Sequence, residues 1–422
     1  MWRIAAPMIL SNISVPLLGM VDTGVVGHLE NSTYLGAVAI GGTIFTLLYF
    51  GVNFLRMGTT GIAAQSYGAE DYDGLRVSLG QALIVSLAIA LTFLLLQVPI
   101  GKLTIALLGG DPVTQQHAAT YFHVRIWSAP GTLANYALIG WFLGTQNARV
   151  PLLMFLTINI TNIILDLLFV IGLGMKVEGV ALASVIAEYS GFAVGATFAV
   201  IELRKHSGHW PIARLTNLAA YKAFFTVNAN LFVRSMALMF TFAWVTAQGA
   251  RLGPAILAAN AVLMNFQHLT SLGLDGIAHA AEAMVGKAVG QKDDNVLRHT
   301  VSLTLRWSLI FAAGFTVLYI VAGPLIVRVL TDLPDVRATA MVYLPWLIAS
   351  PLISVWCFLY DGVYVGMTRA REMRNIMVFS TFVVFLPLWF VTQGLGNHGL
   401  WLALMAFMAS RGIGMHIGYK RF

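Results

Sequence analysis

The chain has 422 residues, of which 58% are hydrophobic and only 10% charged, and its mean hydropathy is +0.79. A soluble domain carries roughly 25% charged residues, so this composition excludes an ordinary water-soluble protein and predicts a chain embedded in lipid. The formal net charge is +7, but no helix face combines basic and aromatic residues in the way that nucleic-acid binding requires. The single cysteine, Cys357, lies in an apolar run, so no disulfide can form within the chain.

Apolar stretches of about 20 residues, enough to cross a bilayer, recur along the whole sequence. We predict an all-α membrane protein of twelve transmembrane helices, which cover residues 4–27, 34–59, 77–97, 118–143, 152–173, 179–203, 219–247, 255–285, 301–322, 338–366, 376–395 and 399–417. The N-terminus enters the first stretch directly, without the small-residue cleavage site of a signal peptide, so a spanning helix is expected there.

Lysine and arginine are distributed unevenly between the loops. An even number of spans places both termini on one side of the membrane, and the loops of that side contain most of the basic residues. The positive-inside rule therefore predicts that both termini are cytoplasmic and that the protein is a multi-pass component of the inner (plasma) membrane.

The two halves of the sequence resemble each other at a constant offset. Leu35 and Ala37 recur as Leu257 and Ala259, Gly68, Asp71 and Arg76 as Gly290, Asp293 and Arg298, and Gly144 and Arg149 as Gly366 and Arg371. Such a repeat predicts two pseudo-symmetric six-helix bundles related by an axis along the membrane normal. We place the N-terminal bundle at residues 1–203, a cytoplasmic linker at 204–216 and the C-terminal bundle at 217–422.

In chain order, the first informative polar residue is Asp22 in the first span. A carboxylate at the centre of a bilayer costs about 2.5–3.5 kcal/mol, so its presence there suggests a function. Pro7 and Pro16 precede Asp22 in the same span. Each proline removes a backbone hydrogen bond, and two interpretations stay open: a fixed kink, or a helix that changes its bend when Asp22 gains or loses a proton.

The fourth, fifth and sixth spans add polar residues to the N-terminal half. In the fifth span, Asn159, Asn162 and Asp166 fall on one helix face, which should point into the bundle. In the sixth span, Ser184 and Glu188 share a face, and Asn135 lies in the fourth. Two neighbouring carboxylates, Asp22 and Asp166, could carry a coupling proton, whereas the alternative is a buried network that only holds helices together. The matched positions of the second half are apolar: Trp244, Val384 and Leu388 stand where the first half has Asp22, Asn162 and Asp166.

The C-terminal half has its own polar residues within spans. Asp275, His279 and Glu282 share one face of the eighth span, and Asp361 lies in the tenth. Five arginines also fall within spans: Arg56, Arg125, Arg234, Arg306 and Arg411. Pairing among these groups is the simpler interpretation, and a second ion site in the C-terminal bundle is the alternative.

Two sequence segments carry a family resemblance. Residues 21–27 (VDTGVVG) and 58–68 (GTTGIAAQSYG) are similar to signatures of the multidrug and toxic compound extrusion (MATE) family, and Asn162-x-x-x-Asp166 resembles its DinF-like branch. The resemblance implies a V-shaped pair of six-helix bundles and a cation-coupling site at Asp22, Asn162 and Asp166. It also implies that Ser184 occupies a position where the family commonly has a small hydroxyl residue. The acidic residue that another branch carries in helix seven is missing here.

From these features we expect a secondary active exporter that exchanges cytoplasmic organic compounds, often cations, for protons. Sodium coupling and a flippase for lipid-linked precursors remain alternatives, and the flippase would need a strongly basic cavity. No zinc-protease, nucleophile-elbow or phosphate-loop motif supports an enzyme. The expected partners are small organic substrates and the bilayer, with no nucleic acid, no metal and no cofactor besides the coupling ion, for a protein that works as a monomer.

Overall fold

The computed structural model describes residues 1–27 and 32–421, without the side chains of residues 15–23, 25–27 and 32. It divides into two compact units, which we call the N-terminal unit, Ala6–Phe225, and the C-terminal unit, Thr226–Phe422 together with Met1–Ala5. All regular secondary structure in the described residues is helical, which confirms the predicted all-α class.

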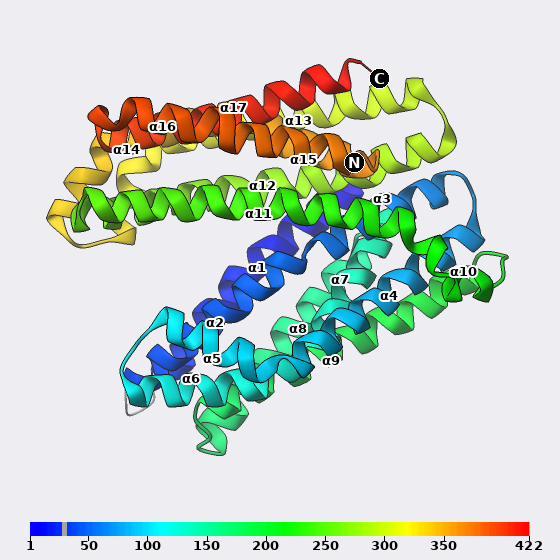
Figure 1. Ribbon diagram of the computed structural model, residues 1–422, viewed down its shortest axis with the longest axis horizontal. Coiled ribbons are helices and arrows are strands. Elements are labelled where there is room, and N and C mark those ends of the chain that lie inside the picture. The colour runs from blue at the N-terminus through cyan, green and yellow to red at the C-terminus, as the bar shows by residue number, and fades with distance from the viewer. Residues whose placement is uncertain (28–31, 422) are drawn as a thin grey trace. The chain divides into compact units, whose positions relative to one another are not determined.

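The helices of the N-terminal unit follow one another with short connections (Figure 1). They are α1 (Trp2–Gly27), α2 (Ser32–Val52), α3 (Phe54–Gly68), α4 (Tyr72–Leu95), α5 (Gln97–Leu108), α6 (Pro112–Arg125), the 3-10 turn η1 (Ile126–Ser128), α7 (Ala129–Gly144), α8 (Arg149–Asp166), the π-helical segment η2 (Leu167–Gly172), α9 (Val177–Arg204), α10 (Ile212–Thr216) and η3 (Leu218–Tyr221).

The C-terminal unit begins with four long helices and continues with shorter helical segments before its last helix. They are α11 (Lys222–Leu252), α12 (Pro254–Gln291), α13 (Asp294–Leu330), α14 (Pro334–Gly366), α15 (Ala370–Phe379), the π-helical segment η4 (Ser380–Phe385), α16 (Leu386–Thr392), η5 (Gln393–Leu395) and α17 (Asn397–Tyr419). Trp2 contacts Trp307 of α13 edge to face, with ring centroids 4.9 Å apart, which joins the start of α1 to this unit.

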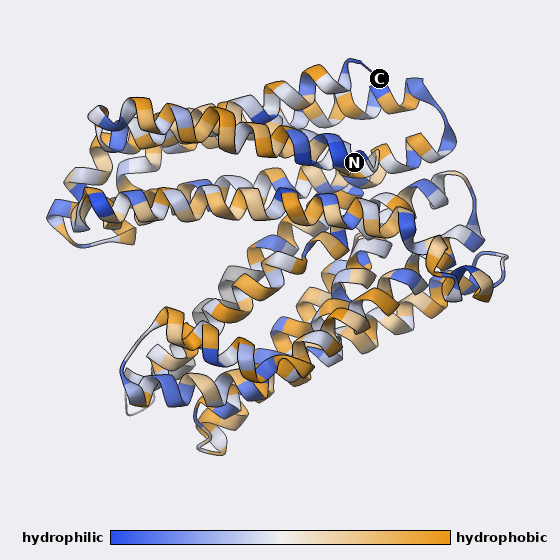
Figure 2. Ribbon diagram, in the orientation of Figure 1, coloured by the Kyte–Doolittle hydropathy of each residue, from blue (hydrophilic) through white to orange (hydrophobic). Residues whose placement is uncertain are grey.

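Within the described residues, nine helical stretches are long and apolar enough to cross a membrane. They are Thr33–Gly68, Tyr72–Leu95, Arg149–Gly172, Val177–Arg204, Leu218–Leu252, Asp294–Leu330, Pro334–Gly366, Ala370–Leu395 and Asn397–Tyr419. The other three predicted spans fall on α1, on α6 to α7 and on α12, so the count of twelve stays a prediction. Figure 2 shows apolar residues along most helices and hydrophilic residues most often at their ends.

The sequence repeat is visible in the turns. Asp71 and Asp293 occupy matched positions, and each side chain caps the helix that follows, α4 or α13, by accepting backbone N–H bonds at 2.8–3.0 Å. The residue before each cap, Glu70 or Lys292, has φ of 56°. Left-handed backbone is uncommon for residues other than glycine, so its recurrence shows that the same turn was built twice.

A third cap begins α6 and lies outside the predicted spans. Asp111 accepts hydrogen bonds from the Thr114 hydroxyl and from the backbone N–H groups of Val113 and Thr114. The Thr114 hydroxyl contributes most to lowering the pKa of the Asp111 carboxyl, because these bonds favour its ionised form. Pro112 follows at the first helical position. A backbone N–H at that position has no partner within the helix, so proline, which lacks one, costs no hydrogen bond there.

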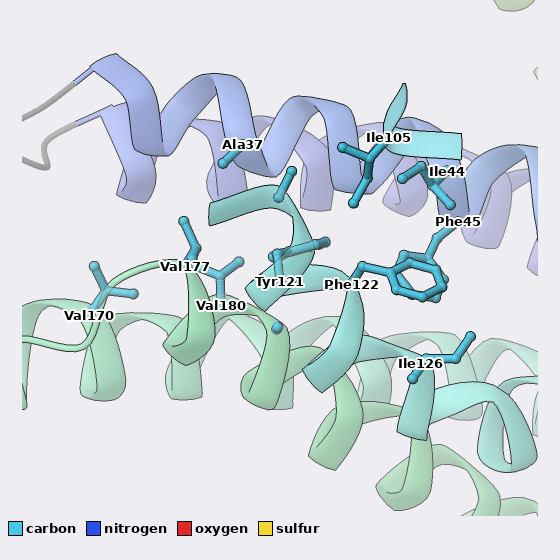
Figure 3. Packing of buried hydrophobic residues seen from close by; sticks show 12 residues of the cluster. Ala37, Ile44, Phe45, Ile105, Tyr121, Phe122, Ile126, Val170, Val177 and Val180 are labelled. Carbon is cyan, nitrogen blue, oxygen red and sulfur yellow. The ribbon is translucent and has the colours of Figure 1, made fainter. Parts of the chain in front are cut away.

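A hydrophobic cluster joins six elements of the N-terminal unit (Figure 3). Its buried members come from α2, α5, α6, η1, η2 and α9: Ala37, Ile44, Phe45, Ile105, Ala118, Tyr121, Phe122, Ile126, Val170, Val177, Val180 and Ala181. Phe45 stacks on Phe122, with ring centroids 5.5 Å apart. This packing holds α9, which carries Ser184 and Glu188, against α2 and α6.

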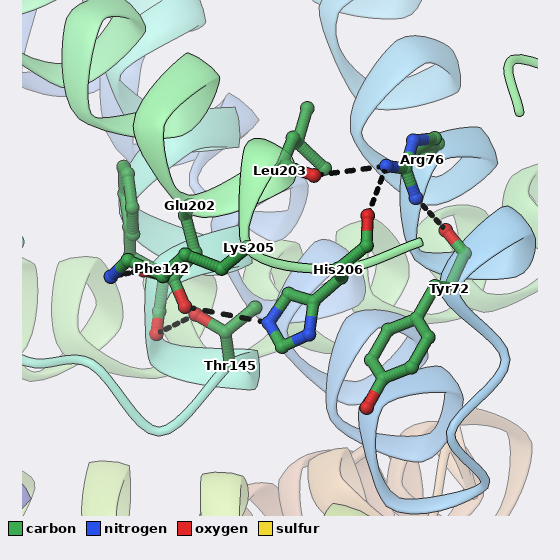
Figure 4. Close-up of polar contacts among 8 residues, drawn as sticks. All are labelled: Tyr72, Arg76, Phe142, Thr145, Glu202, Leu203, Lys205 and His206. Carbon is green, nitrogen blue, oxygen red and sulfur yellow. Dashed lines mark hydrogen bonds and ion pairs between the residues drawn. The ribbon is translucent and has the colours of Figure 1, made fainter. Parts of the chain in front are cut away.

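Residues 204–216, predicted as a linker between the bundles, belong to the N-terminal unit in the structure (Figure 4). Arg76 of α4 is buried and donates to the carbonyl oxygens of Tyr72, Leu203 and His206 at 3.0, 2.9 and 2.8 Å. The His206 ring stacks on Tyr72 with centroids 4.4 Å apart. These contacts attach the start of this segment to α4 and α9, and the boundaries of the bundles and the linker stay predictions.

Candidate ion and substrate site

Helix α1 is continuous from Trp2 to Gly27, so Pro7, Pro16 and Asp22 all lie within one helix. The side chains of Pro16 and Asp22 lie outside the described residues, so the distance between Asp22 and Asp166 stays untested. Near Pro7, the Ser11 hydroxyl donates to the Pro7 carbonyl oxygen at 2.8 Å. Whether α1 bends during transport also remains a prediction.

The polar residues of the fifth predicted span lie on α8 and point into the N-terminal unit, as the sequence predicted. Asn159, Asn162 and Asp166 are 8%, 1% and 0% exposed. The α8 residues Ile160 and Ile164, between them, are 54% and 58% exposed. Helix α8 therefore has a polar face turned toward the protein and an apolar face turned outward. This arrangement is expected, because an ionisable group exposed to lipid is costly.

Ser184 of α9 meets this face of α8. The amide of Asn162 donates to the Ser184 hydroxyl at 3.4 Å, and both residues are buried. Asn162 lies one helical turn before Asp166 on α8. The structure therefore brings Asn162, Ser184 and Asp166 into one neighbourhood. The roles of these residues in ion coupling stay predictions.

Glu188 lies one turn beyond Ser184 on α9 and is fixed to α7. The Asn135 amide donates to both the backbone oxygen and the Oε2 atom of Glu188, each at 2.9 Å. Asn135 is 2% exposed, and Glu188 is half-buried. Asn135 therefore links α7 to α9 by hydrogen bonds. A row of polar residues runs from Asp166 and Asn162 on α8 to Ser184 and Glu188 on α9.

The α8 helix changes its winding directly after Asp166. Residues Leu167–Gly172 form the π-helical segment η2. In the second half, the segment η4 covers positions that match Asn159 and Asn162, and there Thr381 contacts Thr241 of α11 through their hydroxyls at 3.2 Å. Single π-helical turns often occur at functional sites. The hydropathy of the sequence did not predict either of the two π-helical segments.

In the C-terminal unit, Asp361 of α14 forms ion pairs with two arginines. Its Oδ2 atom accepts from Arg234 of α11 and, at 2.8 Å, from Arg411 of α17. The Arg411 guanidinium also lies over the Phe407 ring, 5.2 Å from the ring centroid. Asp361 is therefore paired with arginines, which is the simpler of the two interpretations. Its two partners come from two other helices, so three helices meet at this carboxylate.

The other acids of this unit lie on α12. The Nδ1 atom of His279 lies 3.4 Å from Oε2 of Glu282, which is 2% exposed. Asp275 is half-buried and interacts electrostatically with Arg411. Asp275 therefore shares a charged neighbour, Arg411, with Asp361, and His279 pairs with Glu282.

Three further arginines of the predicted spans lie in different surroundings. Arg125 lies over the rings of Phe45 and Tyr121, 5.1 and 5.4 Å from their centroids, in the N-terminal unit. Arg234 is occupied by Asp361 in the C-terminal unit, and Arg306 is exposed on α13. The flippase, which would need a strongly basic cavity, stays an alternative.

One buried polar network was missed in the sequence. Asn260 of α12 and Asn397 of α17 exchange hydrogen bonds at 2.8 and 2.9 Å, and Trp401 donates to Asn260 at 3.0 Å. Asparagines within or beside apolar spans were the available signal, and in lipid such amides pair across helices.

Two known proteins resemble the chain over nearly its full length. "DNA damage-inducible protein F" of Escherichia coli (strain K12) is 41% identical over 423 residues, covering 100% of this chain and 92% of that protein. "Multidrug export protein MepA" of Staphylococcus aureus (strain NCTC 8325 / PS 47) is 23% identical over 418 residues, covering 96% of this chain and 90% of that protein.

The fold has a close counterpart among solved structures. A crystal structure of MATE in the bent conformation superposes with a TM-score of 0.87 at 18% identity, covering 99% of this chain and 94% of that one. The described helices and this likeness define a multi-pass helical membrane protein with a transporter fold. The sequence model of the MatE family matches residues 7–168 and 229–391, one segment in each half. The chain belongs to the MatE family, whose members are transporters and not enzymes.

Proposed function

We propose that the protein exports organic compounds, often cations, from the cytoplasm in exchange for protons. The observation that carries this proposal is Asp166, a carboxylate with 0% exposure inside a unit made of membrane-crossing helices. Such a group is costly to keep in lipid unless its charge changes during a cycle or is compensated. The similarity to a multidrug export protein of Staphylococcus aureus supports efflux of varied compounds.

In the proposed cycle, Asp166 and Asp22 take up a proton from outside, and Asn162 holds the site together. Substrate leaves in that state. The protein then opens to the cytoplasm, releases the proton there and binds the next substrate. A proton moving through about 100 mV supplies about 2.3 kcal/mol. Each pH unit across the membrane adds about 1.4 kcal/mol. For an uncharged substrate exchanged for one proton, the two terms together support a gradient of several hundred-fold. For a monovalent cation exchanged for one proton no net charge moves, so only the pH term contributes, about tenfold per pH unit.

We further propose an orientation with both termini in the cytoplasm of a bacterial inner membrane, and a monomer as the working unit. The basic residues of the terminus-side loops support the orientation. Sodium remains the alternative coupling ion, because the amide and carboxylate oxygens around Asn162 and Asp166 are ligands that a cation accepts.

The test is exchange in proteoliposomes with a proton gradient and a sodium gradient imposed separately. We expect the proton gradient alone to drive export, and Asp22→Asn and Asp166→Asn each to abolish that exchange, because an amide cannot carry the proton. Asp332→Asn is the matched control, since its side chain is fully exposed in a loop of the C-terminal unit. Normal proton-driven exchange in both site variants would remove the coupling assignment, and exchange driven only by sodium would replace the proton.

A further inference from the structure

Glu188 lies in a setting that differs from that of Asp166. Asp166 is 0% exposed, whereas Glu188 is half-buried on α9 and fixed by two hydrogen bonds from Asn135. A fully buried carboxylate is within reach of a proton or a small ion only. A half-buried one can also be approached by a larger molecule. This difference in access separates the two carboxylates of the N-terminal unit.

Two tyrosines accompany Glu188. Tyr49 of α2 and Tyr136 of α7 are half-buried, and both interact electrostatically with Glu188. Their rings meet edge to face, with centroids 6.5 Å apart, and both pack on a core cluster of the N-terminal unit. The Tyr49 hydroxyl is held by a hydrogen bond to Ser128 at 2.9 Å. Three helices therefore bring one carboxylate and two aromatic rings into one neighbourhood of the N-terminal unit.

A carboxylate beside aromatic rings is the chemistry that recognises a positively charged nitrogen or phosphorus centre. The ring faces attract a cation through their quadrupoles, and the carboxylate supplies the opposite charge. The unit already contains one such arrangement, since Arg125 lies over Phe45 and Tyr121 and also interacts electrostatically with Glu188. Arg125 lies over those two rings and interacts electrostatically with Tyr49, and Arg56 does so with Tyr136.

We propose that Glu188, Tyr49 and Tyr136 form the subsite that recognises the cationic centre of an exported organic cation. Asp166 would handle the coupling ion, and Glu188 would select the substrate by its charge. The inference rests on the proposed export of organic cations. It differs from a purely structural role of Glu188, which would be to clamp α9 to α7 through Asn135.

Binding of tetraphenylphosphonium to the purified full-length chain, measured by calorimetry in detergent micelles, tests the subsite. Glu188→Gln keeps an oxygen acceptor for Asn135 but removes the charge, so we expect at least about tenfold weaker binding. Glu178→Gln, on the first turn of the same helix, is the matched control and should bind as the wild type does. Tyr136→Leu should weaken binding more than Tyr136→Phe, because only phenylalanine keeps the ring.

Unchanged binding in Glu188→Gln would overturn the proposal. So would an equal loss of binding of the anion tetraphenylborate, since a general fold defect does not discriminate by charge. Wild-type proteoliposomes without proton-driven exchange, combined with Glu188-dependent binding of tetraphenylphosphonium, would overturn the coupling proposal and leave the subsite in place.

Discussion

At the scale of single residues, Asp361 is the clearest case of a charge that the fold compensates. One carboxylate oxygen accepts from two arginines that come from different helices, and the side chains of Arg234 and Arg411 are 9% and 5% exposed. Two guanidinium groups in this environment require a counter-charge, because an isolated buried charge is strongly unfavourable.

Replacing Asp361 by asparagine should therefore destabilise the protein. We expect a loss of about 3–5 kcal/mol in the free energy of unfolding, since two buried positive charges lose their common partner. Thermal unfolding in detergent measures the effect. Glu372→Gln is the control, because Glu372 and its partner Arg369 are exposed, and such surface pairs contribute about 0–1 kcal/mol. Equal melting temperatures for the two variants would contradict the argument.

At the scale of helices, the repeat determines where backbones approach most closely. A methyl group on Gly140 of α7 would collide with the backbone oxygen of Arg56 in α3, and one on Gly362 of α14 would collide with that of Ala278 in α12. The two pairs occupy matched positions of the two halves. Small residues allow this approach, which in lipid supplies much of the packing between helices.

Alanine at either glycine should consequently be destabilising. We expect Gly140→Ala and Gly362→Ala each to lower stability by about 1–3 kcal/mol, the usual effect of overpacking, and to do so to a similar extent. Gly314→Ala on α13 is the control, because nothing lies within 4 Å of the position that its methyl group would take. Retention of wild-type unfolding temperatures by both variants would show that the helices can shift apart at little cost.

The repeat also offers a matched pair of arginines. Arg76 is 5% exposed and donates to three carbonyl oxygens, whereas Arg298, its counterpart, is exposed at the start of α13. Arg76 contacts the segment 204–216 through the carbonyl oxygen of His206. Of the two matched arginines, it is therefore the one expected to hold that segment in place.

Arg76→Ala should release that segment. We expect faster trypsin cleavage at Arg204, Lys205 or Arg214 in detergent, because hydrogen bonds from a charged donor are worth about 1.5–3 kcal/mol each. Arg298→Ala should leave the cleavage rate as in the wild type. Equal rates in the two variants would mean that other contacts, such as the 3.2 Å bond from Gln81 to the Ala220 carbonyl oxygen, suffice to fix the segment.

At the scale of the whole molecule, the orientation in the membrane follows from loop charge. Fluorescent protein fused after Phe422 should fold and fluoresce, because the C-terminus is expected in the cytoplasm. Alkaline phosphatase fused after Leu333, between α13 and α14, should be active, since that loop is expected outside. The opposite pattern of reporter activity would invert the topology and the direction assigned to transport.

The sequence by itself determined the helical class, the membrane environment, the repeat and the buried face of α8. These features depend on composition and local periodicity, because a chain in lipid must satisfy its backbone bonds within helices. The structure alone decided that Asp361 pairs with Arg234 and Arg411, that Asn135 holds Glu188, and that the linker attaches to Arg76. Such contacts join residues far apart in the chain, and they depend on which helix faces meet when the units pack.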